Sequence, residues 1–220
     1  MFENRIEAGR RLAQVLEAYA GRPDVVVLAL PRGGVPVGLE VARALQAPLD
    51  VFVVRKLGVP GNPELALGAI ASGGVRVLNT EVLRLVDVSM STVDAITERE
   101  RRELERREHL YRGARPAAEI AGRTVIIVDD GLATGASMRA AVQAVRGMGP
   151  SRIVVAVPTA ARDTCVALRR EADEVICVET PEPFYAVGGS YIEFEQITDD
   201  DVHDYLEQAP APSGDRAARG

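Results

Sequence analysis

The chain has 220 residues, 47% of them hydrophobic and 26% charged, and its 26 Lys and Arg against 32 Asp and Glu give a formal net charge of −6. This composition excludes collagen-like, low-complexity and disulfide-scaffold proteins, and the length fits one compact domain with an appendage better than two separate cores. The acidic balance argues against broad binding to nucleic acid or to an anionic membrane, and we expect neither as a partner.

Further classes of protein are disfavoured by the cysteines, the histidines and the N-terminal residues. Cys165 and Cys177 lie among apolar residues without a Cys-x-x-Cys pattern, which predicts buried free thiols in a reducing compartment. Because His109 and His203 are the only histidines, a His-based metal site and a His-dependent catalytic triad are disfavoured. The N-terminal residues carry charges too often for a signal peptide, and no apolar run approaches about 18 residues, so we expect a cytoplasmic protein without a membrane span.

Taken in chain order, the first part of the sequence alternates between helix and strand patterns. Apolar residues at helical spacing open the chain, and Gly21 and Pro23 stop that helix. The elements predicted next are a strand at 25–30, a helix at 35–45, a strand at 49–54, a Gly- and Pro-rich loop at 55–63, and a small hairpin made of 67–71 and 75–78.

Residues 91–113 differ from the rest because they contain a dense block of alternating charges, ERERRELERRE. Val93, Ile96, Leu104 and Tyr111 are the few apolar positions. This pattern predicts a charged helical insertion with one solvated face and ion pairs between residues four apart. A nucleic-acid-binding arm would need an excess of Arg over Glu, whereas the two signs balance here.

The remaining sequence returns to strand and helix alternation. Strands are predicted at 124–128, 152–158 and 175–178, with helices at 136–146 and 161–170 and a disordered tail at 207–220. Repeated strand–loop–helix units predict one α/β domain over residues 1–206, with a doubly wound, mainly parallel sheet and helices on both faces.

The most informative segment is VIIVDDGLATGAS, residues 125–137. Asp129 and Asp130, here called the acid pair, end an apolar strand, where charge is costly unless it is paired. Residues 133–137, here called the phosphate loop, open a helix with small and hydroxyl residues, which suits a phosphate monoester. Capping alone would explain Thr134 or Ser137 singly, and a receiver-like phosphoacceptor would explain only the acids. Together they predict a ribose 5-phosphate site, with the phosphate on the loop and the hydroxyls on the acids.

Two other strand ends carry groups suited to anions. Arg32, Gly33 and Gly34, here called the glycine turn, let backbone amides approach an anion while the guanidinium binds phosphate oxygens. Arg55 and Lys56, here called the basic pair, follow the second strand. Either signal alone is weak, but jointly with the acid pair they predict a ribose 5-phosphate that carries a pyrophosphate.

These segments resemble those of the type I phosphoribosyltransferase family. VIIVDDGLATGAS resembles its loop for 5-phosphoribosyl-1-pyrophosphate (PRPP), with Gly131 standing where many members carry an aliphatic residue. FENRIEAGRRLA, LPRGGVPVG, RKLGVPGNPELALGAIASGG and FYAVGGSY resemble a bacterial group of phosphoribosyltransferase-domain proteins, and the resemblance covers about residues 2–206. It also implies a non-proline cis peptide bond near residues 31–33.

The resemblance implies transfer of the phosphoribosyl group from PRPP to a nitrogenous acceptor with release of pyrophosphate. The acid pair would hold the ribose hydroxyls near the developing cation, and one member could act as a base. Mg²⁺ carried mainly by PRPP, without a protein ligand assigned, would help to neutralise the diphosphate. The phosphate-binding positions implied are Ala133, Thr134, Gly135, Ala136 and Ser137, and the diphosphate-binding positions are Arg32, Gly33, Gly34, Arg55 and Lys56.

The acceptor side is less defined in the sequence. Four of the nine aromatic residues crowd into 184–194, and the family places a small hood over the ribose, here expected at 179–198. Phe184, Tyr185 and Tyr191 would then stack on the acceptor, or they merely pack the hood onto the core. Residues 58–64 could close over the substrate or form a structured turn.

Two classes of function remain open at this point. One is an enzyme, an Mg²⁺-dependent phosphoribosyltransferase acting on a base. The other is a PRPP-binding regulator on the same fold, which would normally carry a DNA-binding domain or a basic face. A homodimer is compatible with either class.

Overall fold

The computed structural model describes residues 1–210, apart from the side chains at 63 and 64. Its centre is a five-stranded sheet in the order β2-β1-β6-β7-β8, and every neighbouring pair in it is parallel. The strands are β1 (Val25–Ala29), β2 (Leu49–Val51), β6 (Thr124–Val128), β7 (Arg152–Thr159) and β8 (Glu174–Glu179). All five were expected from the sequence, and the parallel α/β fold is confirmed.

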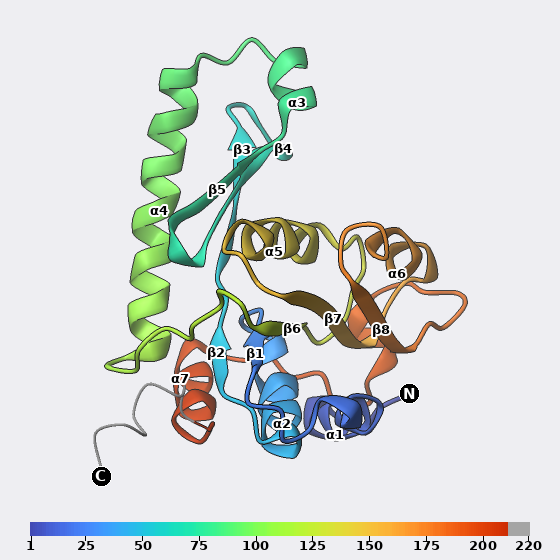
Figure 1. Ribbon diagram of the computed structural model, residues 1–220. Helices are drawn as coiled ribbons and strands as arrows, with labels where there is room; N and C mark the ends of the chain where they lie inside the picture. The colour runs from blue at the N-terminus through green and yellow to red at the C-terminus, as the bar shows by residue number, and fades with distance from the viewer. Residues whose placement is uncertain (211–220) are drawn as a thin grey trace.

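Helices cover both faces of this sheet (Figure 1). Side chains alternate between the two faces along each strand, so β1 sends Val27 into one core and Leu28 into the other. The helices packed on the first core are α1 (Arg5–Val15) and α2 (Gly34–Leu45), and those on the second are α5 (Ala136–Gly147) and α6 (Arg162–Leu168). The doubly wound arrangement is therefore confirmed.

A second, antiparallel sheet stands beside the first. It has the order β3-β4-β5 and consists of β3 (Val54–Val59), β4 (Asn62–Ala71) and β5 (Val75–Leu78), followed by α3 (Thr80–Leu85). The predicted hairpin around Ser72 is confirmed, since Ala71 pairs with Val75. The predicted loop at 55–63 is wrong, because a strand irregularity at Gly58 and a tight turn at Pro60 and Gly61 accommodate its Gly and Pro inside a hairpin.

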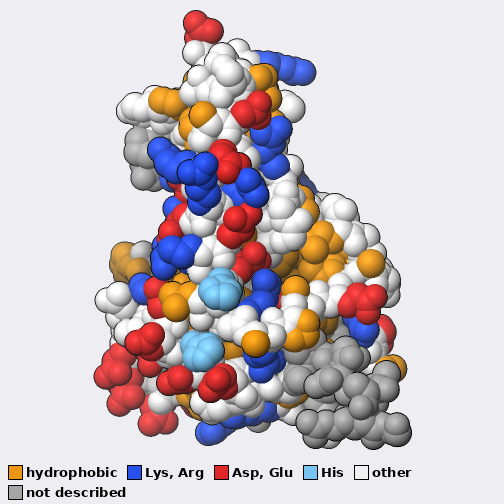
Figure 2. Space-filling model, turned by 90° about the vertical axis from the view of Figure 1, so that its left-hand side faces the viewer, with side chains coloured by type: hydrophobic (Ala, Val, Ile, Leu, Met, Phe, Trp, Pro, Cys, Tyr) orange, Lys and Arg blue, Asp and Glu red, His pale blue; other side chains and the backbone are white. Residues whose placement is uncertain are grey.

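The charged insertion forms a single long helix, α4 (Met90–Arg112), which runs along the second sheet (Figure 1). Val93, Ile96, Leu104 and Tyr111 are all buried, as their spacing predicts. On the face that Figure 2 turns to the viewer, Arg and Lys side chains are intermixed with Asp and Glu. This intermixing matches the predicted solvated helix with balanced charge.

The C-terminal part returns to the main body through short elements. After β8 come the 3-10 turn η3 (Val187–Ser190) and the helix α7 (Asp199–Glu207), and the earlier 3-10 turns are η1 (Glu17–Tyr19) and η2 (Ser72–Gly74). Ala209 is buried, and the Pro210 carbonyl accepts a hydrogen bond from the Leu49 amide. The predicted disordered tail is therefore wrong for 207–210, and its remainder, 211–220, lies outside the described residues.

The two cysteines are paired with each other. Cys165 in α6 and Cys177 in β8 form a disulfide, so the prediction of free thiols is wrong. Their separation of 12 residues gave no sign of this, because only the fold brings α6 against β8. Within residues 1–210, no helix has the length and apolarity that a bilayer crossing requires.

We expect replacement of both Cys165 and Cys177 by Ala to lower the free energy of unfolding by about 2–3 kcal/mol, because the cross-link restricts the unfolded chain. Equilibrium unfolding in guanidinium chloride measures this loss. The parent treated with a thiol reductant is the matched reference and should lose a similar amount. A parent whose unfolding midpoint does not respond to the reductant would contradict the pairing.

Candidate active site

The candidate site lies where the order of strands in the main sheet reverses. From β1 the chain passes to β2 on one side, whereas β6, β7 and β8 follow on the other side. In open parallel sheets the connections diverge at this point and leave a crevice beyond the carboxyl ends of the strands. The glycine turn follows β1, and the acid pair follows β6. Both predicted anion- and sugar-binding segments therefore lie against each other at this point of the sheet.

The glycine turn lies directly against the acid pair. A Cβ atom added to Gly33 would lie 2.0 Å from Asp130 Oδ2, and one added to Gly34 would lie 2.9 Å from the Asp129 Cα and 2.8 Å from the Val128 carbonyl oxygen. Only glycine permits this approach. The peptide bond between Pro31 and Arg32 is cis, within the range that the family resemblance implies.

The members of the acid pair differ in their partners. Arg5, from the start of α1, places its Nε 2.8 Å from Asp130 Oδ2. Asp129 Oδ1 instead accepts a hydrogen bond of 2.9 Å from the Asp130 amide. Burial raises the pKa of both carboxyls, and the neighbouring Asp130 charge raises that of Asp129 further, whereas Arg5 acts to lower the pKa of Asp130. Both residues keep partial contact with solvent, so a ligand can reach them.

The phosphate loop is open and supported from behind. Gly135 has φ of 72°, which favours glycine, while Ala133, Thr134, Ala136 and Ser137 are exposed. Thr134 Oγ1 accepts a long hydrogen bond of 3.4 Å from the Ala136 amide. The loop ends at the first turn of α5, where backbone amides and the helix dipole favour anions.

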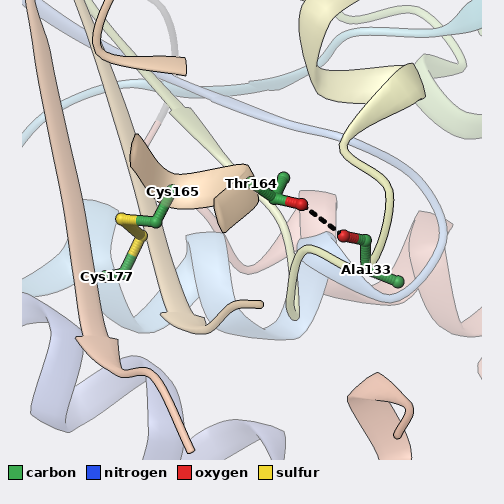
Figure 3. Close-up of a disulfide and its surroundings, with 4 residues drawn as sticks. All are labelled: Ala133, Thr164, Cys165 and Cys177. Atoms are coloured by element: carbon green, nitrogen blue, oxygen red, sulfur yellow. Dashed lines mark hydrogen bonds between the residues drawn. A yellow bond between two sulfur atoms is a disulfide. The ribbon is translucent and has the colours of Figure 1, made fainter. Parts of the chain in front are cut away.

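Helix α6 forms the support behind this loop (Figure 3). The Thr164 hydroxyl donates a hydrogen bond of 2.6 Å to the Ala133 carbonyl oxygen. The next residue along the chain is Cys165, which the disulfide ties to β8. The sheet edge, α6 and the phosphate loop are thus linked in series through covalent and hydrogen bonds.

The basic pair lies on the second sheet, within β3, rather than at the end of a strand in the main sheet. It lines a cavity of about 650 Å³ together with Ser137 of the phosphate loop and with Arg99 and Glu100 of α4. Arg55 is held there by Glu100, whose Oε2 accepts from the Arg55 Nε at 3.0 Å. Glu100 Oε1 accepts a hydrogen bond of 3.0 Å from Arg99 Nη2. The one buried carboxylate therefore pairs with two guanidinium groups.

Arg32 of the glycine turn is paired with a carboxylate of α7. Its Nη1 lies 3.7 Å from Asp199 Oδ1 at the start of α7, and both side chains are partly exposed. Tyr111 of α4 donates a hydrogen bond of 2.8 Å to the same Asp199 oxygen. Burial, followed by this hydrogen bond, raises the pKa of Tyr111 to about 12.

The aromatic residues of the expected hood have different surroundings. Tyr191 is buried between Phe2 and Phe194, with ring centroids 5.6 Å and 5.1 Å away, and its hydroxyl donates to the Asp130 carbonyl oxygen. Tyr185 is 89% exposed, and Phe184 is partly buried. Of the three, Tyr191 alone contacts the acid pair in the described structure. Its stacking on an acceptor, and that of Phe184 and Tyr185, stays a prediction.

The departure at Gly131 has a packing explanation. A Cβ atom there would lie 2.6 Å from Val187 Cγ1 and 2.9 Å from Thr159 Cγ2. Val187 of η3 occupies the space that a side chain at residue 131 would fill.

Three charged residues that pair with these segments were not singled out from the sequence. They are Arg5, Glu100 and Asp199, which contact Asp130, Arg55 and Arg32, respectively. Arg5 stands in a helix that holds Arg10 and Arg11, and Glu100 stands in a helix rich in Glu, so neither differed from its neighbours. The one available signal was the position of Arg5 in the first turn of a helix, where the helix dipole disfavours a cation.

Comparisons with known proteins identify relatives of this chain. The family model for the phosphoribosyl transferase domain matches residues 2–191. Two Mycobacterium tuberculosis proteins, "Putative phosphoribosyl transferase MT0597" of strain CDC 1551 / Oshkosh and "Putative phosphoribosyl transferase Rv0571c" of strain ATCC 25618 / H37Rv, are each 49% identical over 209 residues. The match covers 95% of this chain and 47% of each relative, so the chain spans about half their length.

One solved structure is similar over nearly the whole chain. The crystal structure of TT1426 from Thermus thermophilus is 47% identical with a TM-score of 0.85, and the match covers 95% of this chain and 99% of that one. The main sheet, the second sheet and their helices therefore form an arrangement that a related protein shares.

We expect Gly33→Ala to lower the free energy of unfolding by about 1–3 kcal/mol, because the new methyl group would displace the Asp130 carboxylate. Gly189→Ala is the matched control, since an added Cβ there meets no heavy atom within 4 Å, and it should change stability by less than about 0.5 kcal/mol. Chemical denaturation measures both. Equal losses in the two variants would contradict the close approach.

We expect Asp129→Asn to make the protein more stable at neutral pH than its parent. A raised pKa means that the folded protein binds this proton more tightly than the unfolded chain does. The stability contribution is therefore complete below the unfolded pKa of about 3.9 and is lost as pH rises through the folded pKa. Asn carries no charge and can still accept from the Asp130 amide.

Unfolding midpoints measured from pH 4 to 8 should diverge with rising pH for this variant. Asp204→Asn, which changes an exposed carboxyl, should follow the parent throughout. A constant offset between Asp129→Asn and the parent at every pH would show that the carboxyl does not titrate in this range.

Proposed function

Because this chain belongs to the phosphoribosyl transferase domain family, we propose that it transfers the 5-phosphoribosyl group from PRPP to a nitrogenous acceptor, a nucleobase being the acceptor class we favour, with release of pyrophosphate. The observation that carries the proposal is the direct contact between the glycine turn and the acid pair at the point where strand order reverses. This contact joins a turn suited to an anion with carboxylates suited to a sugar diol.

The proposed division of labour follows from charge and exposure. The phosphate loop binds the 5-phosphate through exposed amides and the hydroxyls of Thr134 and Ser137, and it acts as a remote anchor. The acid pair accepts hydrogen bonds from the ribose hydroxyls and faces the positive charge that develops at C1. Arg32 and the basic pair stabilise the negative charge that accumulates on the leaving diphosphate.

Magnesium enters this proposal through the substrate. Among residues 1–210, no group of three or more His, Cys, Asp or Glu side chains is arranged to hold a metal ion. In this proposal Mg²⁺ arrives with PRPP and is held mainly by the oxygens of PRPP. Such an ion would supply charge neutralisation on the diphosphate.

The acceptor, the assembly and the location belong to the proposal as well. We expect the acceptor beside the segment 184–194, where Tyr191 contacts Asp130. A homodimer and a cytoplasmic location stay predictions. The cysteines do not support that location, because Cys165 and Cys177 are paired in a disulfide.

A PRPP-binding regulator remains the second candidate. One observation bears on it: the α4 face in Figure 2 intermixes both charge signs, which does not suit a nucleic-acid backbone. Exposed phosphate-loop residues and a partly exposed acid pair would serve a sensor of PRPP as well as an enzyme. Turnover separates the two functions.

The experiment is pyrophosphate release from PRPP with Mg²⁺ across a panel of purine and pyrimidine bases, followed by mass spectrometry of the product. The proposed function expects one acceptor to give stoichiometric pyrophosphate and a nucleoside monophosphate. Tight binding of PRPP without release for any acceptor would favour the regulator. Absence of PRPP binding would overturn both.

We expect the paired substitution Asp129→Asn and Asp130→Asn to lower the single-turnover rate by about 10²–10³-fold, since it removes negative charge facing the developing cation. PRPP is itself highly anionic, so its affinity should change little or tighten. Both quantities are measured on the variant and the parent. Collapsed affinity with an unchanged rate per bound PRPP would show that the acids only bind.

A further inference from the structure

A buried arginine contacts the acid pair without having been assigned any role. Arg5 is only 9% exposed, and its guanidinium makes three contacts. Its Nε lies 2.8 Å from Asp130 Oδ2, its Nη1 donates to the Glu195 carbonyl oxygen at 2.7 Å, and its Cζ lies 3.8 Å from the centroid of the Phe194 ring. A buried arginine needs such partners, and here one of them is a proposed substrate-binding carboxylate.

The start of α1 is built to hold this side chain in place. Asn4 caps the helix by accepting hydrogen bonds from the amides of Ile6 and Glu7. Gly9, one turn later, lies so close to α2 that an added Cβ would meet the Val37 carbonyl oxygen at 2.9 Å. The helix is thus fixed at its cap and along its side. A cation in the first turn opposes the helix dipole, so helix stability does not explain an arginine at this position.

None of the other polar or charged groups described around Asp130 forms an ion pair with its carboxylate as Arg5 does. Asp129 is a like charge, and Arg32 of the neighbouring turn pairs with Asp199. Tyr191 donates to the Asp130 carbonyl, and Tyr205 lies within electrostatic range of Arg5. Burial is the main cause that raises the pKa of each of these tyrosines, so both stay neutral at working pH. Within residues 1–210, the ion pair that the acid pair makes is therefore the one with Arg5.

We propose that Arg5 is a positioning residue that fixes Asp130 as the ionised and oriented member of the acid pair, whereas Asp129 has no ion-pair partner of this kind among residues 1–210. The inference rests on the proposed function for its meaning, because it divides two carboxylates that the reaction would otherwise use alike. The proposal also explains the position of the C-terminal segment, because the Phe194 ring and the Glu195 carbonyl oxygen contact the same guanidinium that pairs with Asp130.

The test follows the carboxyl carbons directly, so it needs no turnover. In protein with ¹³C-labelled aspartate carboxyls, assigned with Asp129→Asn and Asp130→Asn, the parent should show Asp130 ionised at lower pH than Asp129. Arg5→Gln should raise the Asp130 titration midpoint by about 1–2 pH units, the effect of removing an adjacent opposite charge. Arg5→Lys keeps the charge and should restore most of the shift.

Two controls keep the outcome interpretable. Arg10→Gln removes an arginine from the same helix that is exposed and paired with Glu40, and it should leave both midpoints unchanged. Circular dichroism confirms that each variant is folded before it is titrated. If Arg5→Gln unfolds the chain, Arg5→Lys is compared with the parent instead, and its Asp130 should still titrate below Asp129.

An Asp130 midpoint that does not move in folded Arg5→Gln would overturn the proposal. So would an Asp129 that ionises before Asp130 in the parent or in Arg5→Lys. If the protein releases pyrophosphate with one of the bases, the rate of release can be measured against pH. In Arg5→Gln the low-pH limb of this rate profile should shift together with the Asp130 titration midpoint. A carboxyl shift without turnover in the parent would count against the proposed function while leaving the role of Arg5 standing.

Discussion

Two carboxylates that stand side by side at the end of a buried strand repel each other and lose hydration, and the surrounding structure is arranged around that pair. Asp130 is stabilised by a guanidinium from the N-terminal helix, and Asp129 by an amide of its neighbour. Gly33 and Gly34 lack side chains, so the preceding βα turn can lie against the acids. The repulsion and lost hydration of the two carboxylates lower the stability of the folded protein. Such destabilising groups are typical of positions that bind ligands or take part in catalysis.

Local sequence patterns predicted the main sheet and the segments at its crevice because their signals are themselves local. The apolar run before Asp129 marks a doubly buried strand, and the small residues after it mark an open helix start. In the second sheet, the hairpin around Ser72 was predicted, but strand β3 was missed because the turn at Pro60 and Gly61 that follows it has the same composition as an extended loop. Arg5 and the cysteine pair were missed for another reason. Their partners lie 125 and 12 residues away, and only the assembled fold brings those partners near.

The second sheet and α4 place the basic pair somewhat differently from the prediction. Arg55 and Lys56 belong to β3, and Glu100 sets the direction of the Arg55 guanidinium by a buried ion pair. The glycine turn is similarly joined to α7 through Arg32 and Asp199, and α7 to α4 through Tyr111. The two arginines proposed for the diphosphate are therefore each matched by an acidic side chain from a neighbouring helix. An incoming polyanion would have to compete with those carboxylates, and this competition favours ligands of high charge over singly charged ones.

The cavity described above has its two walls on different layers of the protein. Ser137 belongs to the layer built on the parallel sheet, whereas Arg55 and Lys56 belong to the antiparallel sheet and Glu100 to its long helix. Helix α5, whose first turn carries Ser137, also packs against the strands of the antiparallel sheet, so contacts between the two layers bound this cavity of about 650 Å³. A ligand that touched both walls would therefore bridge the two sheets of the protein, with Ser137 on one side of it and the basic pair on the other.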